Sequence, residues 1–399
     1  MTLVIIKTII TLTKILIIKK IINKERRKAM SIYEELGVPT ILNAAGTYTV
    51  LGGSKMSKQT LDDMADAAGS FVQIRILQKA VNSAVAKLTR NESAYISNGA
   101  ATGLYLSIAA AIQMHLGKKF YYITKEEIAK TNIVMFKAHR NPYDLVIGHL
   151  GAQYRELSFP NIIFPPTEED LRMAIDENTA AVYYAQSGWV APGYLPLDKT
   201  IQIAGEKNIP VIVDAAAQLP PVENLWKFTE MGAAIALFSG GKDLKGPQAS
   251  GLMVGKKELM DIVSSIGFPN YGIGRMMKVG REEMVGLYSA VKQYISLDHQ
   301  ARGNWCEVQV EKFKRAFTGS KTFHAVRSYP NEAGQPIPRV FLEIVDEKVT
   351  PEQVHDFLLA GNPSIYANSD GLNGIFINPM SLEEGDSDVI MKRLLEFSC

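Results

Sequence analysis

The segment Ala233-Ala-Ile-Ala-Leu-Phe-Ser-Gly-Gly-Lys-Asp-Leu-Lys-Gly-Pro-Gln-Ala-Ser-Gly-Leu-Met-Val-Gly255 contains two apolar runs separated by a turn. The first run, residues 233–238, is typical of a buried strand. It ends in Ser239-Gly-Gly-Lys242, where the glycines tolerate backbone angles that other residues resist. A lysine in this position, with a hydroxyl three residues before it, suits a Schiff base with pyridoxal 5'-phosphate (PLP), and Ser239 would bind part of the phosphate. A surface turn with a solvated lysine explains the same residues equally well.

Length and composition describe an ordinary globular protein. The chain has 399 residues, of which 47% are hydrophobic and 21% are charged, and this length predicts one large domain and one smaller domain. The net charge of +2 gives no sign of a nucleic-acid partner. The two cysteines, Cys306 and Cys399, make neither a disulfide framework nor a metal site. We therefore expect no metal, and a reducing cytoplasm as the location.

Residues 1–29 differ from the rest of the chain in being rich in isoleucine, leucine, threonine and lysine. Lys7 and Lys14 interrupt every apolar run long enough to span a bilayer, and a signal peptide would have a cleaner apolar core. An amphipathic helix on a membrane surface is one alternative, because residues 24–28 carry a basic cluster. We expect instead that translation begins at Met30, so that this extension is untranslated or disordered and the protein has no membrane partner.

Strand-like and helix-like segments alternate from about residue 92 to residue 255. This alternation predicts an α/β domain with a large, doubly wound, mostly parallel sheet that is covered on both faces. Ligands bind such sheets outside the carboxyl ends of the strands, so the segments that follow these ends are expected to meet in one cleft. Those segments contain residues 97–102, His139, Gln186 and Ser187, Asp214, and Ser239 and Lys242.

The domain boundary is expected close to residue 300. Residues 30–300 are assigned to the large domain, which includes an extended N-terminal arm at residues 40–51. Residues 301–399 are predicted to form a smaller α+β C-terminal domain. In it we expect strands at 339–344 and 374–377, and helices at 351–359 and 387–397.

A turn before one predicted helix is a candidate phosphate site. Ser97-Asn-Gly-Ala-Ala-Thr-Gly103 opens this helix, where free backbone N–H groups and the helix dipole favour an anion. An ordinary N-cap has the same composition, because serine and asparagine cap many helices. The turn supplies five candidate cofactor-binding residues: Ser97, Gly99, Ala100, Ala101 and Thr102.

Three side chains at other strand ends complete the candidate cofactor site. Asp214 ends the run Val211-Ile-Val-Asp and would keep a PLP ring nitrogen protonated, although capping a helix is a common role for such an aspartate. His139 would stack on the ring, and a solvated or core histidine is an equal alternative. Ser187 would reach the ring hydroxyl or the substrate, where an ordinary loop serine is the simpler reading.

Taken together, these motifs resemble the selenocysteine synthase-like group of fold type I PLP enzymes. The resemblance covers nearly all of residues 31–399. It implies that Lys242 carries the cofactor, that Asp214 pairs with the ring nitrogen, and that the protein is a homodimer or larger homo-oligomer with active sites at subunit contacts. Lys245 competes with Lys242, but only Lys242 has the Ser-x-x-Lys spacing. The motifs are Asp214-Ala-Ala-Ala-Gln-Leu-Pro-Pro, Ser239-Gly-Gly-Lys242 followed by Gly246-Pro-Gln248, and Asn43-Ala-Ala-Gly-Thr47.

The group includes D-glucosaminate-6-phosphate ammonia-lyases and L-seryl-tRNA(Sec) selenium transferases. We expect a lyase that removes an α-proton, eliminates a β-hydroxyl and releases ammonia and a 2-oxo acid from an amino acid or amino sugar acid. The transferase is the alternative, and tRNA is the less expected partner because the net charge is near neutral and residues 1–29 do not resemble that family's extra N-terminal domain. A PLP-binding protein without turnover is a third reading.

The carboxylate of an amino substrate calls for a planar cation, and a guanidinium suits it. Arg339, at the start of a small-domain strand, is the first candidate and Arg275 is the second, while a surface position explains either arginine as well. Arg275 and Lys278 are also candidates for the phosphate of a sugar-acid substrate or the cofactor phosphate of a partner subunit. Asn43, which belongs to the resemblance, completes the predicted substrate residues.

Overall fold

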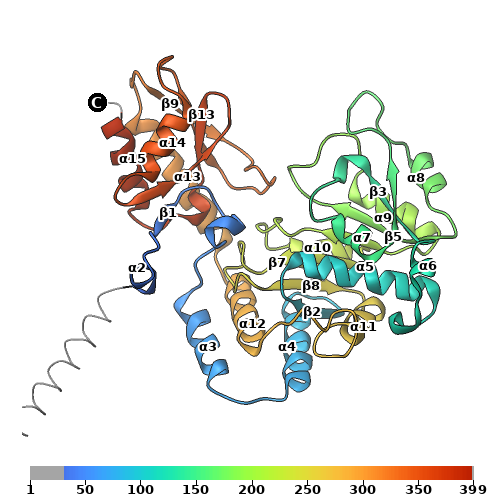
Figure 1. Ribbon diagram of the computed structural model, residues 1–399. Coiled ribbons are helices and arrows are strands. Elements are labelled where there is room, and N and C mark those ends of the chain that lie inside the picture. Colours follow the sequence, from blue (N-terminus) through green and yellow to red (C-terminus); the bar gives the residue numbers. More distant parts are fainter. Residues whose placement is uncertain (1–30, 398–399) are drawn as a thin grey trace, which may run out of the picture.

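The computed structural model describes residues 31–397. The predictions made for residues 1–29 and for Cys399 therefore concern parts of the chain outside the described residues. The chain forms a large α/β domain and a smaller domain, which stand side by side in Figure 1. Within residues 31–397, no helix has the length and apolar character needed to cross a membrane.

A seven-stranded mixed sheet forms the centre of the large domain, in the order β2-β8-β7-β6-β5-β3-β4. β8 is antiparallel to both of its neighbours, and the other pairs are parallel. The predicted mostly parallel, doubly wound sheet is thus confirmed, with one reversed strand next to its edge. The strands are β2 (Ser93–Ser97), β3 (Asn132–Phe136), β4 (Gln153–Leu157), β5 (Thr179–Ala185), β6 (Val211–Asp214), β7 (Ile235–Ser239) and β8 (Gly251–Gly255).

Helices cover both faces of this sheet (Figure 1). The inner strands are mainly apolar because successive side chains point to opposite faces and both faces are covered: Val134 and Phe136 belong to one apolar cluster, Ile133 and Met135 to the other. The edge strand β4 is mainly polar. One face packs against α4 (Ile74–Leu88), α8 (Glu168–Ala174), α9 (Leu197–Glu206), α10 (Asn224–Glu230) and α12 (Arg281–Ile295), with α3 (Lys58–Ala68) lying on α12. The other face packs against α5 (Ala100–Leu116), α6 (Lys125–Ile128), α7 (Leu145–Leu150) and α11 (Lys257–Ile266).

The smaller domain is a four-stranded antiparallel sheet in the order β12-β13-β10-β9, packed against helices. Its predicted strands and helices are present. Its elements are α13 (His299–Ala316), β9 (Phe323–Ser328), β10 (Arg339–Ile344), α14 (Pro351–Leu359), β11 (Ser364–Tyr366), β12 (Asn368–Ser369), β13 (Gly374–Ile377) and α15 (Asp386–Phe397).

Two features of the smaller domain differ from the sequence expectation. The helix α13 was not predicted, because its buried face is a narrow stripe that includes a glutamine: Cys306, Gln309, Val310 and Phe313. The N-terminal arm, assigned to the large domain, contributes β1 (Ile41–Asn43), which pairs in parallel with β11. Ala44, which follows β1, is fully buried in the core of the smaller domain. The arm therefore connects the two domains.

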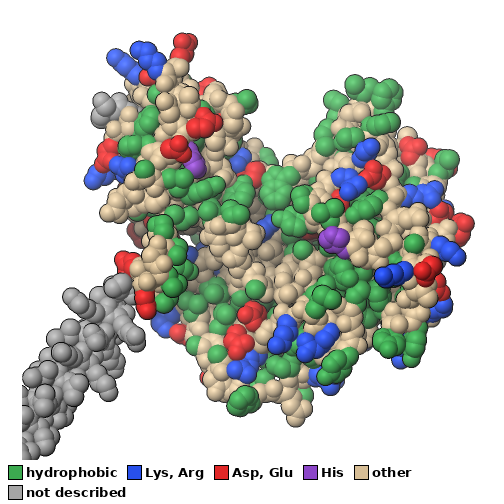
Figure 2. Space-filling view, in the orientation of Figure 1, with side chains coloured by type: hydrophobic (Ala, Val, Ile, Leu, Met, Phe, Trp, Pro, Cys, Tyr) green, Lys and Arg blue, Asp and Glu red, His purple; other side chains and the backbone are tan. Residues whose placement is uncertain are grey.

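The surface is hollowed between the two domains, and hydrophobic side chains lie on both sides of the hollow (Figure 2). The loop between β9 and β10 reaches across to the large domain. The backbone oxygen of Ala333 accepts hydrogen bonds from the Gly188 N–H (2.8 Å) and from Gln218 Nε2 (2.7 Å). Gln335 Nε2 also donates to the Leu219 carbonyl. These contacts bring a small-domain loop against segments that follow β5 and β6.

Candidate active site

The strand register brings the carboxyl ends of β2, β7, β6 and β5 to one edge of the large sheet. Ser97 and Ser239 both pair with Gly251, at the start of the reversed strand β8. Asp214 pairs with Ala185 on one side and with Leu237 on the other. Residues that are far apart in the sequence therefore lie in neighbouring strands at the same edge, where parallel sheets bind ligands.

Two adjoining cavities open at this edge. The first, of about 190 Å³, is lined by Asp214, Ser187 and Lys242. The second, of about 200 Å³, is lined by Tyr48 and Glu332. Lys242, Trp189, Tyr143 and Ala217 line both cavities. Lys242 thus stands between a space bounded by the large-domain strand ends and a space bounded by the N-terminal arm and the small-domain loop.

Lys242 lies in a tight turn directly after β7. Ser54 Oγ donates a hydrogen bond to the Lys242 carbonyl (2.8 Å), and Gly53 has a positive φ of 73° and approaches Gly241 so closely that a side chain there would overlap the Gly241 carbonyl. The Lys242 Nζ is 5.5 Å from the centroid of the Trp189 ring. Burial lowers the pKa of Lys242, and the charges of Asp214 and Glu332 partly oppose this shift. A lowered pKa makes the neutral amine, a nucleophile and a base, more available.

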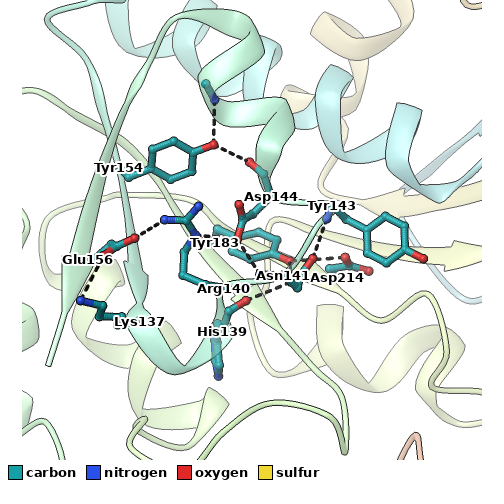
Figure 3. A network of polar contacts seen from close by, with 11 residues as sticks. Lys137, His139, Arg140, Asn141, Tyr143, Asp144, Tyr154, Glu156, Tyr183 and Asp214 are labelled. Carbon is teal, nitrogen blue, oxygen red and sulfur yellow. Dashed lines mark hydrogen bonds and ion pairs between the residues drawn. The ribbon is translucent and has the colours of Figure 1, made fainter. Parts of the chain in front are cut away.

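Asp214 lines the first cavity and is part of a hydrogen-bonded chain (Figure 3). Burial raises the pKa of Asp214, while the Ala216 N–H, the charge of Lys242 and Tyr183 oppose the shift. The Ala216 N–H donates to Asp214 Oδ1 (3.1 Å), and the Tyr183 hydroxyl donates to Oδ2 (3.4 Å). Burial also raises the pKa of Tyr183, so this hydroxyl keeps its proton and remains a donor.

The chain of hydrogen bonds continues from Tyr183 to the loop after β3 (Figure 3). Asn141 Nδ2 donates to the Tyr183 hydroxyl (2.9 Å). Asp144 Oδ2 accepts from the Asn141 N–H (2.7 Å) and from Arg140 Nε (2.8 Å). Asp144 is fully buried, and a buried carboxylate is stable only when it is paired in this way. The network therefore holds Tyr183 and Asn141 in fixed positions behind Asp214.

The N-terminus of α5 has the features of an anion site. Gly99 precedes the helix with φ of 117°, and Ser97 Oγ donates to the Gly99 carbonyl (2.8 Å). Any side chain at Gly251 would overlap the Gly99 backbone, so the turn lies directly over the start of β8. Asn98 Oδ1 is buried and has no hydrogen-bond partner among the described residues. Ala100, Ala101 and Thr102 form the first turn of the helix, whose N–H groups have no intrahelical acceptors.

His139 packs beside the site and does not line either cavity. Its ring is 4.4 Å from the Tyr184 ring and 4.8 Å from the Tyr194 ring, measured between centroids. His139 Nδ1 accepts a hydrogen bond from the Ala185 N–H (3.3 Å). The structure gives His139 a place in an aromatic cluster, where burial lowers its pKa to about 3, and its stacking on a cofactor ring stays a prediction.

This burial predicts a pH dependence of stability. The pKa of His139 is 6.5 in its ordinary state and about 3 in the folded protein, so the unfolded chain binds the extra proton more readily. The contribution of neutral His139 to the free energy of unfolding is fully present above pH 6.5. It is lost as the pH falls from 6.5 toward 3, by about 1.4 kcal/mol per pH unit. We expect His139→Phe, which keeps an aromatic ring, to reduce the acid-side slope of the free energy of unfolding, measured by urea denaturation. Equal slopes for the two proteins would contradict the assignment.

The residues predicted to bind the substrate differ in their burial and in their distance from the two cavities. Arg339 is buried, with 7% of its surface exposed, and its Nη1 donates to Glu332 Oε2 (2.7 Å). It is therefore next to the second cavity but already paired with a carboxylate. Asn43 lines neither of the two cavities: its side chain accepts from the Ala45 N–H (2.9 Å) and donates to the Gly46 carbonyl (2.8 Å), which shapes the turn leading to Tyr48.

Arg275 and Lys278 are exposed and lie outside both cavities of this chain. The Arg275 guanidinium is 5.5 Å from the centroid of the Phe268 ring and 6.0 Å from that of Tyr271. The roles expected for Arg275 and Lys278, toward the substrate or toward the cofactor phosphate of a partner subunit, stay predictions.

Sequence reasoning missed several residues that line or support the cavities. Tyr183 is inside a fully buried strand, where a tyrosine looks like any other core residue. Glu332 belongs to an irregular loop without hydrophobic periodicity, Asn331-Glu-Ala-Gly-Gln335, and nothing in the local sequence relates that loop to residue 242. Tyr143 and Trp189 follow β3 and β5, so the strand-end rule alone was a sufficient signal for them.

Comparisons with known proteins show similarity over nearly the whole chain. The D-glucosaminate-6-phosphate ammonia lyase of Salmonella typhimurium is 29% identical over 377 residues, which are 92% of this chain and 98% of the relative. The 5'-C-glycyluridine monooxygenase-decarboxylase of a Streptomyces species is 28% identical, with 91% of each chain covered. An L-seryl-tRNA(Sec) selenium transferase from Proteus mirabilis is 22% identical over 68% of this chain and 60% of the relative. No family model matches the chain.

Solved structures are also similar to this chain over nearly its whole length. A structure of D-glucosaminate-6-phosphate ammonia-lyase has a TM-score of 0.77 and 28% identity, and the match covers 92% of this chain and 98% of that one. A NifS-like protein has a TM-score of 0.59 at 15% identity, with 90% and 99% covered, which is a likeness of fold. The similarity to the first structure extends through both domains.

Proposed function

We propose that this chain, which resembles the selenocysteine synthase-like group of PLP enzymes in sequence and in fold, is a PLP-dependent lyase. Its proposed substrate is an amino acid or amino sugar acid of the D-glucosaminate 6-phosphate type, and its products are ammonia and a 2-oxo acid. The observation that carries the proposal is the placement of Lys242 and Asp214 in one cavity at the edge of a sheet, in a chain with full-length similarity to such a lyase.

The residues present fit PLP. The hydrogen bonds that Lys242 makes within residues 31–397 use its carbonyl and not Nζ, and burial lowers the pKa of the amine, as suits a group that attaches an aldehyde. Asp214 has a pKa raised by burial, and a positively charged ring nitrogen would restore its ionised form. The free N–H groups at the α5 N-terminus, with the hydroxyls of Ser97 and Ser239, would receive the phosphate. Ser187 would meet the ring hydroxyl. When bound, PLP withdraws electrons from the substrate's α-carbon and so makes its proton acidic.

The side chains then have separate tasks. Asp214 would keep the proton on the ring nitrogen, and the network behind Asp214 holds its carboxylate in place. Lys242 Nζ takes the proton from the α-carbon and can return a proton to the leaving hydroxyl. Trp189 and Tyr143 line both cavities and would exclude water from the reacting bonds. The β-hydroxyl leaves as water, one water is added when the amine is released, and the net products are ammonia and a 2-oxo acid.

The proposal is tested by offering PLP and D-glucosaminate 6-phosphate to the purified protein. We expect a visible absorbance band from bound PLP and release of ammonia and a 2-oxo acid in equal amounts, without oxygen consumption. Oxygen uptake would point instead to the type of reaction in the name of the Streptomyces relative. A band that no amino compound changes would identify a silent PLP-binding protein. Binding of seryl-tRNA at low salt would favour the selenium transferase, and failure to take up PLP would remove the whole proposal.

We also propose a homodimer or larger homo-oligomer in the cytoplasm. The resemblance implies subunit contacts at the active site, and several large side chains are exposed on the large domain, including Phe71 and Tyr271. Large exposed apolar patches commonly mark subunit contacts. Light scattering after size-exclusion chromatography measures the mass directly, and a monomer at micromolar concentration would contradict this part of the proposal.

A further inference from the structure

The tip of the loop between β9 and β10 is built to hold one residue, Glu332, at a fixed place between the domains. Asn331 Oδ1 accepts hydrogen bonds from the Ala333 N–H (3.2 Å) and from the Gln335 N–H (2.9 Å). Asn331 Nδ2 donates to Gln335 Oε1 (2.6 Å). Both residues are almost completely buried. The loop is therefore braced from within on either side of Glu332.

The large domain holds the same loop from outside. The Ala333 carbonyl accepts from Gly188 and Gln218, as described above. A Cβ atom at Gly188 would be only 2.6 Å from the Gly334 nitrogen, so the two backbones are in direct contact and only glycine fits at position 188. This close approach fixes the backbone on both sides of Glu332 relative to the segment that follows β5.

The carboxylate of Glu332 is held by two donors. Arg339 Nη1 donates to Oε2 (2.7 Å), and the Tyr48 hydroxyl is 3.4 Å from Oε1. Burial and the charge of Glu332 raise the pKa of Tyr48 to about 12, so Tyr48 is protonated and donates. The Arg339 guanidinium lies 4.1 Å from the centroid of Phe376. Two donors, one from the small domain and one from the N-terminal arm, thus aim one carboxylate, and 22% of the Glu332 side chain remains exposed.

That exposed part faces the second cavity. Glu332 lines it together with Lys242, and its negative charge is one of the influences that act on the Lys242 amine. Arg339 does not line the cavity. A substrate that reaches Lys242 therefore meets the carboxylate of Glu332, whereas Arg339 is paired with that carboxylate through Nη1 and does not line the cavity.

We propose that Glu332 determines substrate specificity by accepting a hydrogen bond from a hydroxyl group on the carbon next to the amine-bearing carbon. The inference deepens the proposed function and rests on it. An ionised carboxylate can only accept hydrogen bonds, so its partner is a donor, and it disfavours a substrate carboxylate by repulsion. In the proposed reaction the amine of the substrate would be engaged at Lys242 and the cofactor, which leaves a hydroxyl as the available donor. Arg339 and Tyr48 are then positioning residues for Glu332.

The test compares ligands that differ by one hydroxyl. Serine and alanine, each as both enantiomers, are mixed with the PLP-bound protein, and dissociation constants are taken from the absorbance change before turnover. We expect the wild type to bind one serine enantiomer roughly tenfold more tightly than the matching alanine, because a hydrogen bond to a charged group has about this value. In Glu332→Gln the ratio should fall, and in Glu332→Leu it should approach one.

Glu332→Leu alone leaves a buried arginine without its partner, which is destabilising. The double variant Glu332→Leu with Arg339→Leu replaces both partners by apolar groups, and it should fold and also show a ratio near one. The matched control is Glu307→Gln, because Glu307 pairs with Arg327 in the same domain but does not line either active-site cavity; its ratio should equal that of the wild type.

The outcomes separate this inference from the proposed function. A wild-type ratio near one, or an unchanged ratio in Glu332→Gln and in the double variant, would overturn the inference even if ammonia is released. A ratio that depends on Glu332 in a protein that releases no ammonia would support the inference and reject the lyase. Because the measurement is an equilibrium ratio, a loss of folded protein lowers the signal but does not change the result.

Discussion

Lys242→Ala is expected to abolish covalent attachment of PLP and to lower kcat by roughly 10²- to 10⁴-fold, the usual contribution of a group that transfers a proton in the transition state. Lys242 is the amine that the structure places between the two cavities, and burial lowers its pKa. The measurement combines the visible absorbance band, borohydride reduction followed by peptide mapping, and steady-state kinetics. The label should appear on the peptide that contains Lys242 in the wild type and on no peptide in the variant.

Lys245→Ala is the matched control for this prediction. Lys245 is three residues away but is exposed, and it lines a different cavity of about 490 Å³ with Asp243 and Arg302. We expect its absorbance band and kcat to match those of the wild type. Attachment of the label to Lys245, or an unchanged band in Lys242→Ala, would show that the assignment of the cofactor lysine is wrong.

Asp214→Asn is expected to lower kcat by about 10²- to 10³-fold, the typical cost of removing one preorganised electrostatic contact from an active site. The amide keeps the shape of the side chain and a hydrogen bond to the ring nitrogen, but it has no negative charge to keep that nitrogen protonated. PLP should still attach to Lys242, so the absorbance band should persist while turnover falls. Tyr183→Phe removes only the hydroxyl that donates to Asp214, and its kcat should fall by no more than about tenfold.

Asp214→Asn is expected to lower kcat but to raise the stability of the PLP-free protein. The folded-state pKa of Asp214 is raised by burial, so the folded protein binds this proton more tightly than the unfolded chain. The resulting stabilisation is present below the ordinary aspartate pKa and is lost as the pH rises through the raised value. We expect PLP-free Asp214→Asn to melt at a higher temperature than the PLP-free wild type at pH 8. A lower melting temperature would indicate that Asp214 is satisfied without the cofactor.

The fold of the large domain was easier to predict from the sequence than the side chains that line the site. The sheet followed from apolar runs such as Val211-Ile-Val, because a strand buried on both faces has to be apolar along its whole length. His139 was expected in the cleft because it follows β3, yet its ring turns toward Tyr184 and Tyr194. The position of a residue in the chain locates its backbone near the sheet edge, but the direction of its side chain depends on which neighbours leave room for it.

The amino-acid sequence by itself determined the alternating strands and helices around the large sheet and the residues at the strand ends, including Lys242 and Asp214, since these depend on patterns within a few residues. Only the tertiary structure decided that β1 joins the smaller domain and that Glu332 faces Lys242. The physical reason is that these placements depend on contacts between surfaces far apart in the chain, such as Gly188 against Gly334. Such contacts are selected by shape and hydrogen bonding after the local elements have formed, and no local pattern records them.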